Sequence, residues 1–168
     1  MPFGLAGALS KAGAPTSGVA QVETTPIVGT ITGDGNATFT ITGAGITGSP
    51  VAISVPVLNG DTPTVVAAKA AVVVNANAAV SALYTASSLV ADFKLTAKKS
   101  AANDATLNIA YTNGTCTGLT PDATSDDTTA GVKGDYRGAE AGTTLVDTTN
   151  TNIYRNTGTN LVPTWTLE

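Results

Sequence analysis

"NGDTPTVVAAKAAVVVNANAAVSALYTASS", residues 59–88, holds the clearest helical pattern in a chain otherwise rich in Thr, Gly and short β-like runs. Asp61 or Thr62 can supply an N-cap oxygen, and Pro63 suits the first turn because its missing N–H is not needed there. The spacing predicts a helix over about 62–80 with one stripe facing a sheet. The residues predicted for that stripe are Val66, Ala70, Val73 and Val80, with Ala76 or Asn77 between the last two.

Strand patterns flank this helix on both sides, clearly at 37–42, 51–57, 90–98 and 105–112 and weakly at 82–88. In each clear run apolar and polar residues alternate, as a half-buried strand requires. Pro56 lies within the second run and predicts an edge strand or a bulge, because proline cannot donate to the ladder. The order predicts an α+β fold in which a small antiparallel sheet is covered by one helix (β-β-α-β-β).

The chain divides by composition into four predicted segments. They are an extended N-terminal arm (1–21), the α+β module (22–120), a polar linker (121–133) and a β-rich C-terminal interaction segment (134–168). The arm is rich in Gly, Ala and Pro and has no sustained period. The C-terminal segment contains the only Trp but too few residues to enclose its apolar side chains, so we expect it to need a partner surface.

The charge content is low, with 12% charged and 42% hydrophobic residues. Uncharged polar surfaces cost less to desolvate and are typical of proteins that lie against other subunits. An ordinary extracellular-type β protein has the same composition, and both interpretations stay open. The net charge of −4 without a basic cluster argues against nucleic-acid binding. No apolar stretch approaches the roughly 20 residues of a membrane span.

Residues with catalytic chemistry are scarce. The chain has no histidine, which excludes Ser-His-Asp and Cys-His arrangements and imidazole metal sites. We interpret the single cysteine, Cys116, as a small filler residue. Asp122, Asp126 and Asp127 form a cation site in one interpretation and a solvated linker in the other, which we favour. We therefore predict no catalytic, cofactor-binding or metal-binding residues and a protein that is not an enzyme.

Residues 48–120 carry a family resemblance. The motifs GSPVAISVPV, GDTPTVVAAK and LTAKKSAANDATLNIAYTNGTCTG, with the spacing between them, resemble a small module found repeatedly in virion structural proteins of tailed bacteriophages. AGAPTSGVAQVET is similar to the start of head decoration proteins that carry such modules, and NIYRNTGTNLVPTWTLE is similar to the ends of phage head and fibre proteins. The helix departs from the usual pattern, since Ala and Val stand where bulkier aliphatic or Arg residues occur.

The resemblance implies a non-enzymatic capsid decoration or cement protein on the capsid surface, present in the host cytoplasm before assembly. Its implied partners are the major capsid protein and copies of itself, with a trimer as one option. The alternative is a tail or fibre component that binds host-surface glycan. We expect interface contacts from apolar residues of the arm and from aromatic and Arg residues of the C-terminal segment. These residues are Phe3, Leu5, Leu9, Tyr136, Arg137, Tyr154, Arg155 and Trp165.

Overall fold

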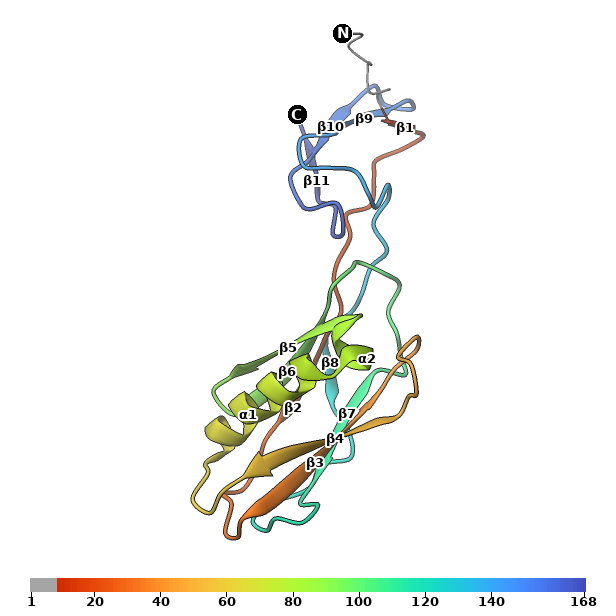
Figure 1. Cartoon of the computed structure of the whole chain (residues 1–168). Coiled ribbons are helices and arrows are strands. Elements are labelled where there is room, and N and C mark those ends of the chain that lie inside the picture. The colour runs from red at the N-terminus through yellow and green to blue at the C-terminus, as the bar shows by residue number, and fades with distance from the viewer. Residues whose placement is uncertain (1–8) are drawn as a thin grey trace, which may run out of the picture. The chain divides into compact units, whose positions relative to one another are not determined.

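The computed structural model describes residues 9–168 of the chain, which form two compact units. We call Gln21–Lys98 with Asn103–Ala130 the core unit. The terminal unit consists of the described residues up to Ala20, Lys99–Ala102 and Gly131–Glu168. The chain therefore passes between the units four times (Figure 1).

The core unit contains two antiparallel sheets. The first has the strand order β4-β3-β7 and is built from β3 (Gly35–Thr42), β4 (Val51–Val57) and β7 (Asn108–Thr112). The second has the order β5-β6-β2-β8 and is built from β2 (Val22–Pro26), β5 (Tyr84–Leu89), β6 (Asp92–Ala97) and β8 (Asp126–Thr129).

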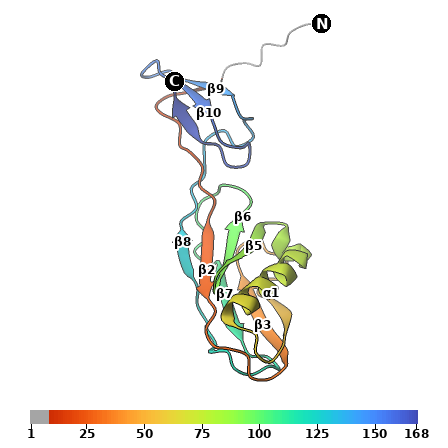
Figure 2. The ribbon, with the colours of Figure 1, turned by 90° about the vertical axis from the view of Figure 1, so that its left-hand side faces the viewer.

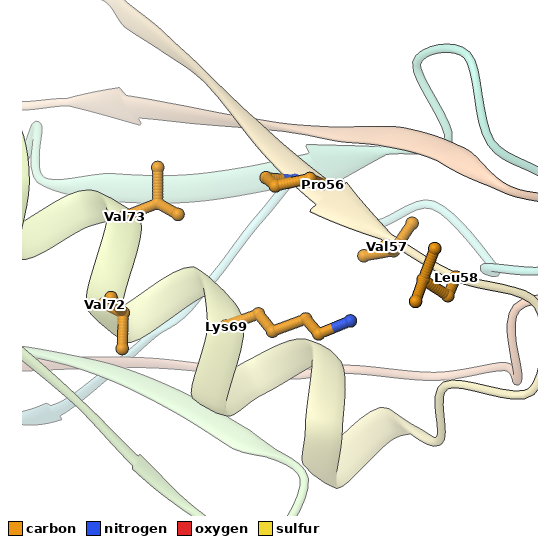
Figure 3. Close-up of a pocket in the computed structure, with 6 residues that line it drawn as sticks. All are labelled: Pro56, Val57, Leu58, Lys69, Val72 and Val73. Carbon is orange, nitrogen blue, oxygen red and sulfur yellow. The ribbon is translucent and has the colours of Figure 1, made fainter.

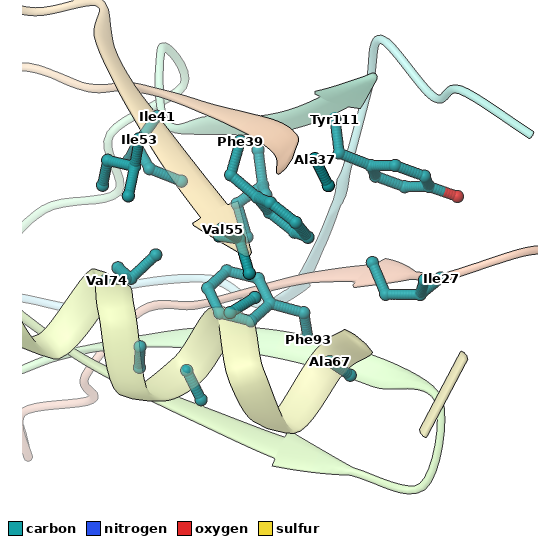
Figure 4. Packing of buried hydrophobic residues seen from close by; sticks show 14 of the residues in the cluster. Ile27, Ala37, Phe39, Ile41, Ile53, Val55, Ala67, Val74, Phe93 and Tyr111 are labelled. Carbon is teal, nitrogen blue, oxygen red and sulfur yellow. The ribbon is translucent and has the colours of Figure 1, made fainter. Parts of the chain in front are cut away.

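Aromatic side chains join the two sheets across the core. The rings of Phe39 on β3 and Phe93 on β6 meet edge to face with their centroids 5.4 Å apart. Tyr111 on β7 stacks on Phe39 at 5.7 Å. All three are buried, and Figure 4 shows them between strands of both sheets. The core unit is thus a β-sandwich whose inner faces supply its hydrophobic core.

One open side of the sandwich is covered by a helix. Helix α1 (Pro63–Ala76) packs against the edge strands β4 and β5 and against β6, and the one-turn helix α2 (Ala78–Ser81) follows it. Figures 1 and 2 both show α1 running beside β5. The N-cap is Thr62, but its side chain makes no capping hydrogen bond. Most of the predicted stripe faces inward: its first two members are buried, its third is half-buried and Val80 of α2 is buried. Of the two alternatives predicted between Val73 and Val80, Ala76 is exposed and Asn77 is half-buried, because α1 ends there.

The predicted β-β-α-β-β fold is wrong, because the protein is mostly β. Eleven strands form three sheets, and α1 is the one helix longer than a single turn in the described chain. The sequence patterns revealed the strands with alternating apolar residues but assigned them all to one sheet. The polar strands β2 and β8 carry no such pattern, and they complete the second sheet.

Two local predictions hold within this different fold. Pro56 lies on β4, which is an edge strand of its sheet. In β6 the alternation places Phe93 and Leu95 in the core, as predicted from the run at 90–98. Period-two patterns therefore assigned side chains to faces correctly even though the sheet topology was not predicted.

The terminal unit contains one four-stranded sheet of order β1-β9-β10-β11. Its strands are β1 (Leu9–Lys11), β9 (Thr144–Asp147), β10 (Ile153–Asn156) and β11 (Trp165–Leu167). Strand β1 pairs in parallel with β9, whereas β9, β10 and β11 pair antiparallel. Residues from the predicted arm and from the predicted C-terminal segment thus share one sheet, and the predicted linker contains β8 of the core unit.

Buried polar side chains organise the turns of the terminal unit. The amide of Asn156 donates to the carbonyl of Ala139 at 2.8 Å, and its oxygen accepts from the backbone N–H groups of Gly158 (3.0 Å) and Thr164 (2.9 Å). The Asp147 carboxylate accepts from the N–H of Gly13 at 2.8 Å. Asp147 and Asn156 are both fully buried, so each satisfies backbone groups that would otherwise lack partners.

Candidate interaction surface

An apolar groove lies between β4 and α1 of the core unit (Figure 3). Its volume is about 410 Å³, within the roughly 300–1,000 Å³ of typical ligand pockets. The wall from the end of β4 and the residue after it consists of Pro56, Val57 and Leu58. The wall from α1 consists of Lys69, Val72 and Val73. We call this feature the α1–β4 groove.

The groove exists because α1 is apolar on two faces. Val66, Ala70 and Val74 are buried against the sheets, whereas Val72 on the outer face is 71% exposed. Leu58, on the opposite wall, is 60% exposed. A surface helix normally carries charged or polar residues on its outer face. The two exposed aliphatic residues therefore give the groove an apolar outer rim.

The single charged side chain of the groove is neutralised by an internal partner. Lys69 forms an ion pair with Asp61, whose carboxylate also accepts from the backbone N–H of Leu58 at 2.8 Å. The hydrogen bond from Lys69 lowers the pKa of Asp61, and the bond from Leu58 acts in the same direction. This ion pair holds the lysine ammonium, and the groove offers chiefly aliphatic surface.

The aromatic residues predicted for the interface lie in the terminal unit and pack together. Trp165 is 7% exposed, and its indole N–H donates to the backbone oxygen of Asp135 at 3.2 Å. The Tyr136 ring lies edge to face with it at 6.3 Å, and the Tyr136 hydroxyl donates to the Ser10 carbonyl. Trp165 therefore supplies core to its own unit, and an interface role for this pair stays a prediction.

The other predicted interface residues are distributed over the terminal unit. Leu9 and Tyr154 both align with the buried Leu145, from the strands on either side of β9. Arg155 is exposed and forms a 2.8 Å ion pair with Glu168. The Arg137 guanidinium donates to the Ser100 carbonyl at 3.0 Å. Phe3 and Leu5 lie outside the described residues.

Two titratable groups of the core unit, Glu23 and Cys116, have pKa values shifted by burial. One oxygen of the buried Glu23 accepts from the Ser125 hydroxyl at 2.6 Å, and the other has no hydrogen-bond partner in the described chain. Burial raises the pKa of Glu23, and the nearby Asp127 adds to the rise. The Cys116 thiol donates to the Asn113 carbonyl at 2.9 Å, and burial raises its pKa.

Sequence reasoning did not find the α1–β4 groove. The available signal was the outer face of the helix, where Val65 and Val72 are seven residues apart and therefore share one face with Lys69. The predicted inward-facing stripe does not account for those two valines. An apolar residue on both faces of a short helix was the pattern that could have indicated a contact surface.

Comparison with family models and with curated proteins gives no match. No family model matches the sequence, and no curated protein matches it significantly. Among residues 9–168, no helix is long and apolar enough to cross a membrane, and no cluster of three or more metal-binding side chains occurs. The functional proposal therefore depends on the residues themselves and on the α1–β4 groove.

Proposed function

We propose that the protein is a non-catalytic structural subunit of a tailed-bacteriophage virion, a capsid decoration protein that stabilises the head through contacts between subunits. Its partners are the major capsid protein and further copies of itself. The motifs within residues 48–120 support this proposal by their resemblance to phage virion modules. The low charge content supports it as well, because uncharged surfaces are desolvated at little cost.

The observation that carries the proposal is the α1–β4 groove. It presents aliphatic side chains from two elements of a well-packed unit, and its one charged group is held by Asp61. Such a surface fits an apolar protein segment better than a polar metabolite, which requires several converging hydrogen-bond groups. The groove is formed on a helix and a strand, so it is positioned by a rigid scaffold.

The size of the groove sets the strength of such contacts. Each ~100 Å² of apolar surface that a partner covers contributes about 2.5 kcal/mol at about 25 cal/mol per Å². Association costs about 4–15 kcal/mol in lost translational and rotational freedom, so a single contact of this size is weak. Repetition around a shell changes this balance, because neighbouring contacts raise the effective concentration of one another. Stabilisation of an assembled head suits weak, repeated contacts of this kind.

Binding to purified empty shells of the encoding phage tests the proposal. We expect saturable co-sedimentation of the protein with shells and an increase in the temperature at which decorated shells disassemble. Serum albumin at the same concentration serves as the negative control. Absence of saturable binding to the shells, or binding to host-surface glycans on an array in its place, would contradict the proposal.

A further inference from the structure

The turn between β5 and β6 presents two adjacent exposed aliphatic residues. Leu89 is 60% exposed and Val90 is 71% exposed, and neither lines the α1–β4 groove of its own chain. Leu89 pairs with Asp92, so that Val90 and Ala91 form the tip of a tight hairpin. Leu89–Ala91 carries no charged side chain. The hairpin is therefore a small convex apolar surface.

Val90 also has a strained backbone. Its φ is 54°, in the left-handed region, where a β-branched residue is a genuine outlier. Glycine, asparagine or aspartate would occupy this position with less strain. Burial within its own chain does not explain the valine, since its side chain is largely exposed. Strained residues persist at functional sites, which suggests that the valine side chain serves a contact made outside its own chain.

We propose that the β5–β6 turn of one copy, with Leu89 and Val90, inserts into the α1–β4 groove of a second copy. Both surfaces are aliphatic, and the one charged side chain of the groove is already paired with Asp61. The groove has a volume of about 410 Å³ and a mostly aliphatic lining, so water in it finds few polar partners. Two aliphatic side chains of the hairpin can displace that water without burying an unpaired charge.

This contact joins two different surfaces, the hairpin of one copy and the groove of another. It closes as a two-fold dimer when each copy inserts its hairpin into the groove of the other, and it forms rings or open arrays when the insertion passes from copy to copy. A hairpin tip covers far less than the about 1,200 Å² buried in a stable protein–protein interface, so the contact is weak between free copies. The inference rests on the proposed function, because the surface of a shell brings the copies close enough together for a weak contact to form.

Self-association of the purified full-length protein tests the contact without shells. Sedimentation velocity from about 10 μM to about 1 mM should show weak, concentration-dependent association of the wild type. We expect Val90→Asp and Val72→Lys each to weaken association by at least about tenfold, because each places a charge in an apolar contact. A mixture of the two variants should regain association with each other, since the carboxylate introduced in the hairpin then meets the ammonium introduced in the groove.

Two further variants separate this contact from a folding defect. Val90→Gly removes the side chain and the strain, so we expect the melting temperature to rise by about 2–4 °C while self-association falls. Leu161→Asp, at an exposed position of the terminal unit, should leave association unchanged. Because the assay contains no shells, failure of this contact and failure of capsid binding give separate results.

Three outcomes would overturn the inference. The first is a wild-type protein that stays monomeric up to about 1 mM. The second is normal self-association of both Val90→Asp and Val72→Lys. The third is loss of association on deletion of residues 1–8 while Val90→Asp associates normally, which would assign the groove to the N-terminal segment of a second copy.

Discussion

The core unit and the terminal unit are both built from short strands, but they exclude water with different side chains. The main cluster of buried hydrophobic residues lies wholly within the core unit. In the terminal unit the buried apolar side chains are Leu145, Pro163 and Trp165, and the polar residues Ser100, Asp147 and Asn156 are buried as well. Apolar packing stabilises the first unit, whereas hydrogen-bonded polar residues hold the turns of the second.

This difference bears on where contact surface is available. The core unit has enough apolar residues to fill its interior and still exposes Leu58, Val72 and Leu89. The terminal unit buries the Trp and also exposes Ile153, Leu161 and Leu167. We expect apolar docking to depend on the core unit, because Leu58 and Val72 line the α1–β4 groove there. The predictions below test the two kinds of stabilisation, from the largest expected effect to the smallest.

Truncation of the aromatic core should have the largest effect. Phe39 is fully buried and contacts both Phe93 and Tyr111. Phe39→Ala should lower the free energy of unfolding of the core unit by about 3–5 kcal/mol, because it leaves a cavity between the two sheets. Urea denaturation followed by circular dichroism measures this change. A loss below about 1 kcal/mol would show that the sandwich core is not the main source of stability.

Removal of a polar residue should have the next largest effect, and it should be confined to the terminal unit. Asn156→Ala leaves the N–H groups of Gly158 and Thr164 without their acceptor. We expect a destabilisation of about 1–3 kcal/mol. Amide hydrogen exchange should show faster exchange in β10 and β11 and unchanged exchange in β3. Equal acceleration in both units would contradict the distinction between them. Thr149→Ala, at an exposed position of the terminal unit, serves as the control.

Acid should act on the core unit through Glu23. Burial raises the pKa of Glu23 above its ordinary value of 4.5 in the folded state. A raised carboxyl pKa means that ionisation disfavours the fold, so the core unit should gain stability as the pH falls from above the folded pKa toward 4.5. Glu23→Gln should remove this dependence. Melting temperatures measured in steps between pH 7 and pH 4.5 give the result, and a wild-type profile identical to that of Glu23→Gln would refute it.

The terminal unit should respond to acid with the opposite sign. The side-chain hydrogen bond from Asn150 lowers the pKa of Asp147 below 3.8, and the bond from Lys11 does the same for Asp135. Their stabilisation is present above pH 3.8 and is lost as the pH falls through the lowered pKa. Asp61 and Asp104 of the core unit also have lowered pKa values, so both units lose such stabilisation below pH 3.8. Because the core unit has the larger buried apolar cluster, nuclear magnetic resonance signals of β9 should weaken before those of β3. Simultaneous loss of both sets would contradict this order.

An exposed ion pair should have the smallest effect. Arg155 and Glu168 are both solvent-accessible, and exposed pairs contribute little. Arg155→Ala should change the stability of the terminal unit by no more than about 0.5 kcal/mol. This residue was also predicted to lie at an interface. If Arg155→Ala leaves thermal unfolding unchanged but weakens binding to shells, the interface prediction gains support; unchanged binding counts against it.

Sequence patterns predicted the parts of the fold that depend on apolar periodicity. The strands around Phe39, Val55 and Phe93 alternate apolar and polar residues, and the helix has Pro63 at its start. Strand β2 could not be found in this way, because its buried residues are Glu23, Thr24 and Thr25. Their burial depends on partners from other strands, which no local pattern reveals.

The terminal unit and the groove were hidden for related reasons. Asn156 and Asp147 fix turns through contacts with residues far along the chain, such as Gly13, and a polar residue of this kind has no periodic signal. The groove needs both the outer face of α1 and the neighbouring strand β4, so it exists only once the two are packed together. The sequence shows Val72 as an apolar residue on the outer face of the predicted helix. It does not show that Leu58 lies on the opposite wall of the groove.

Binding of two matched variants to shells tests the central claim most directly. Val72→Asp places a carboxylate in the α1–β4 groove, and Leu167→Asp places one at an exposed position of the terminal unit. With both variants folded by circular dichroism, we expect Val72→Asp to reduce shell occupancy by at least about tenfold and Leu167→Asp to bind like the wild type. Normal binding of Val72→Asp with loss of binding by Leu167→Asp would contradict the account.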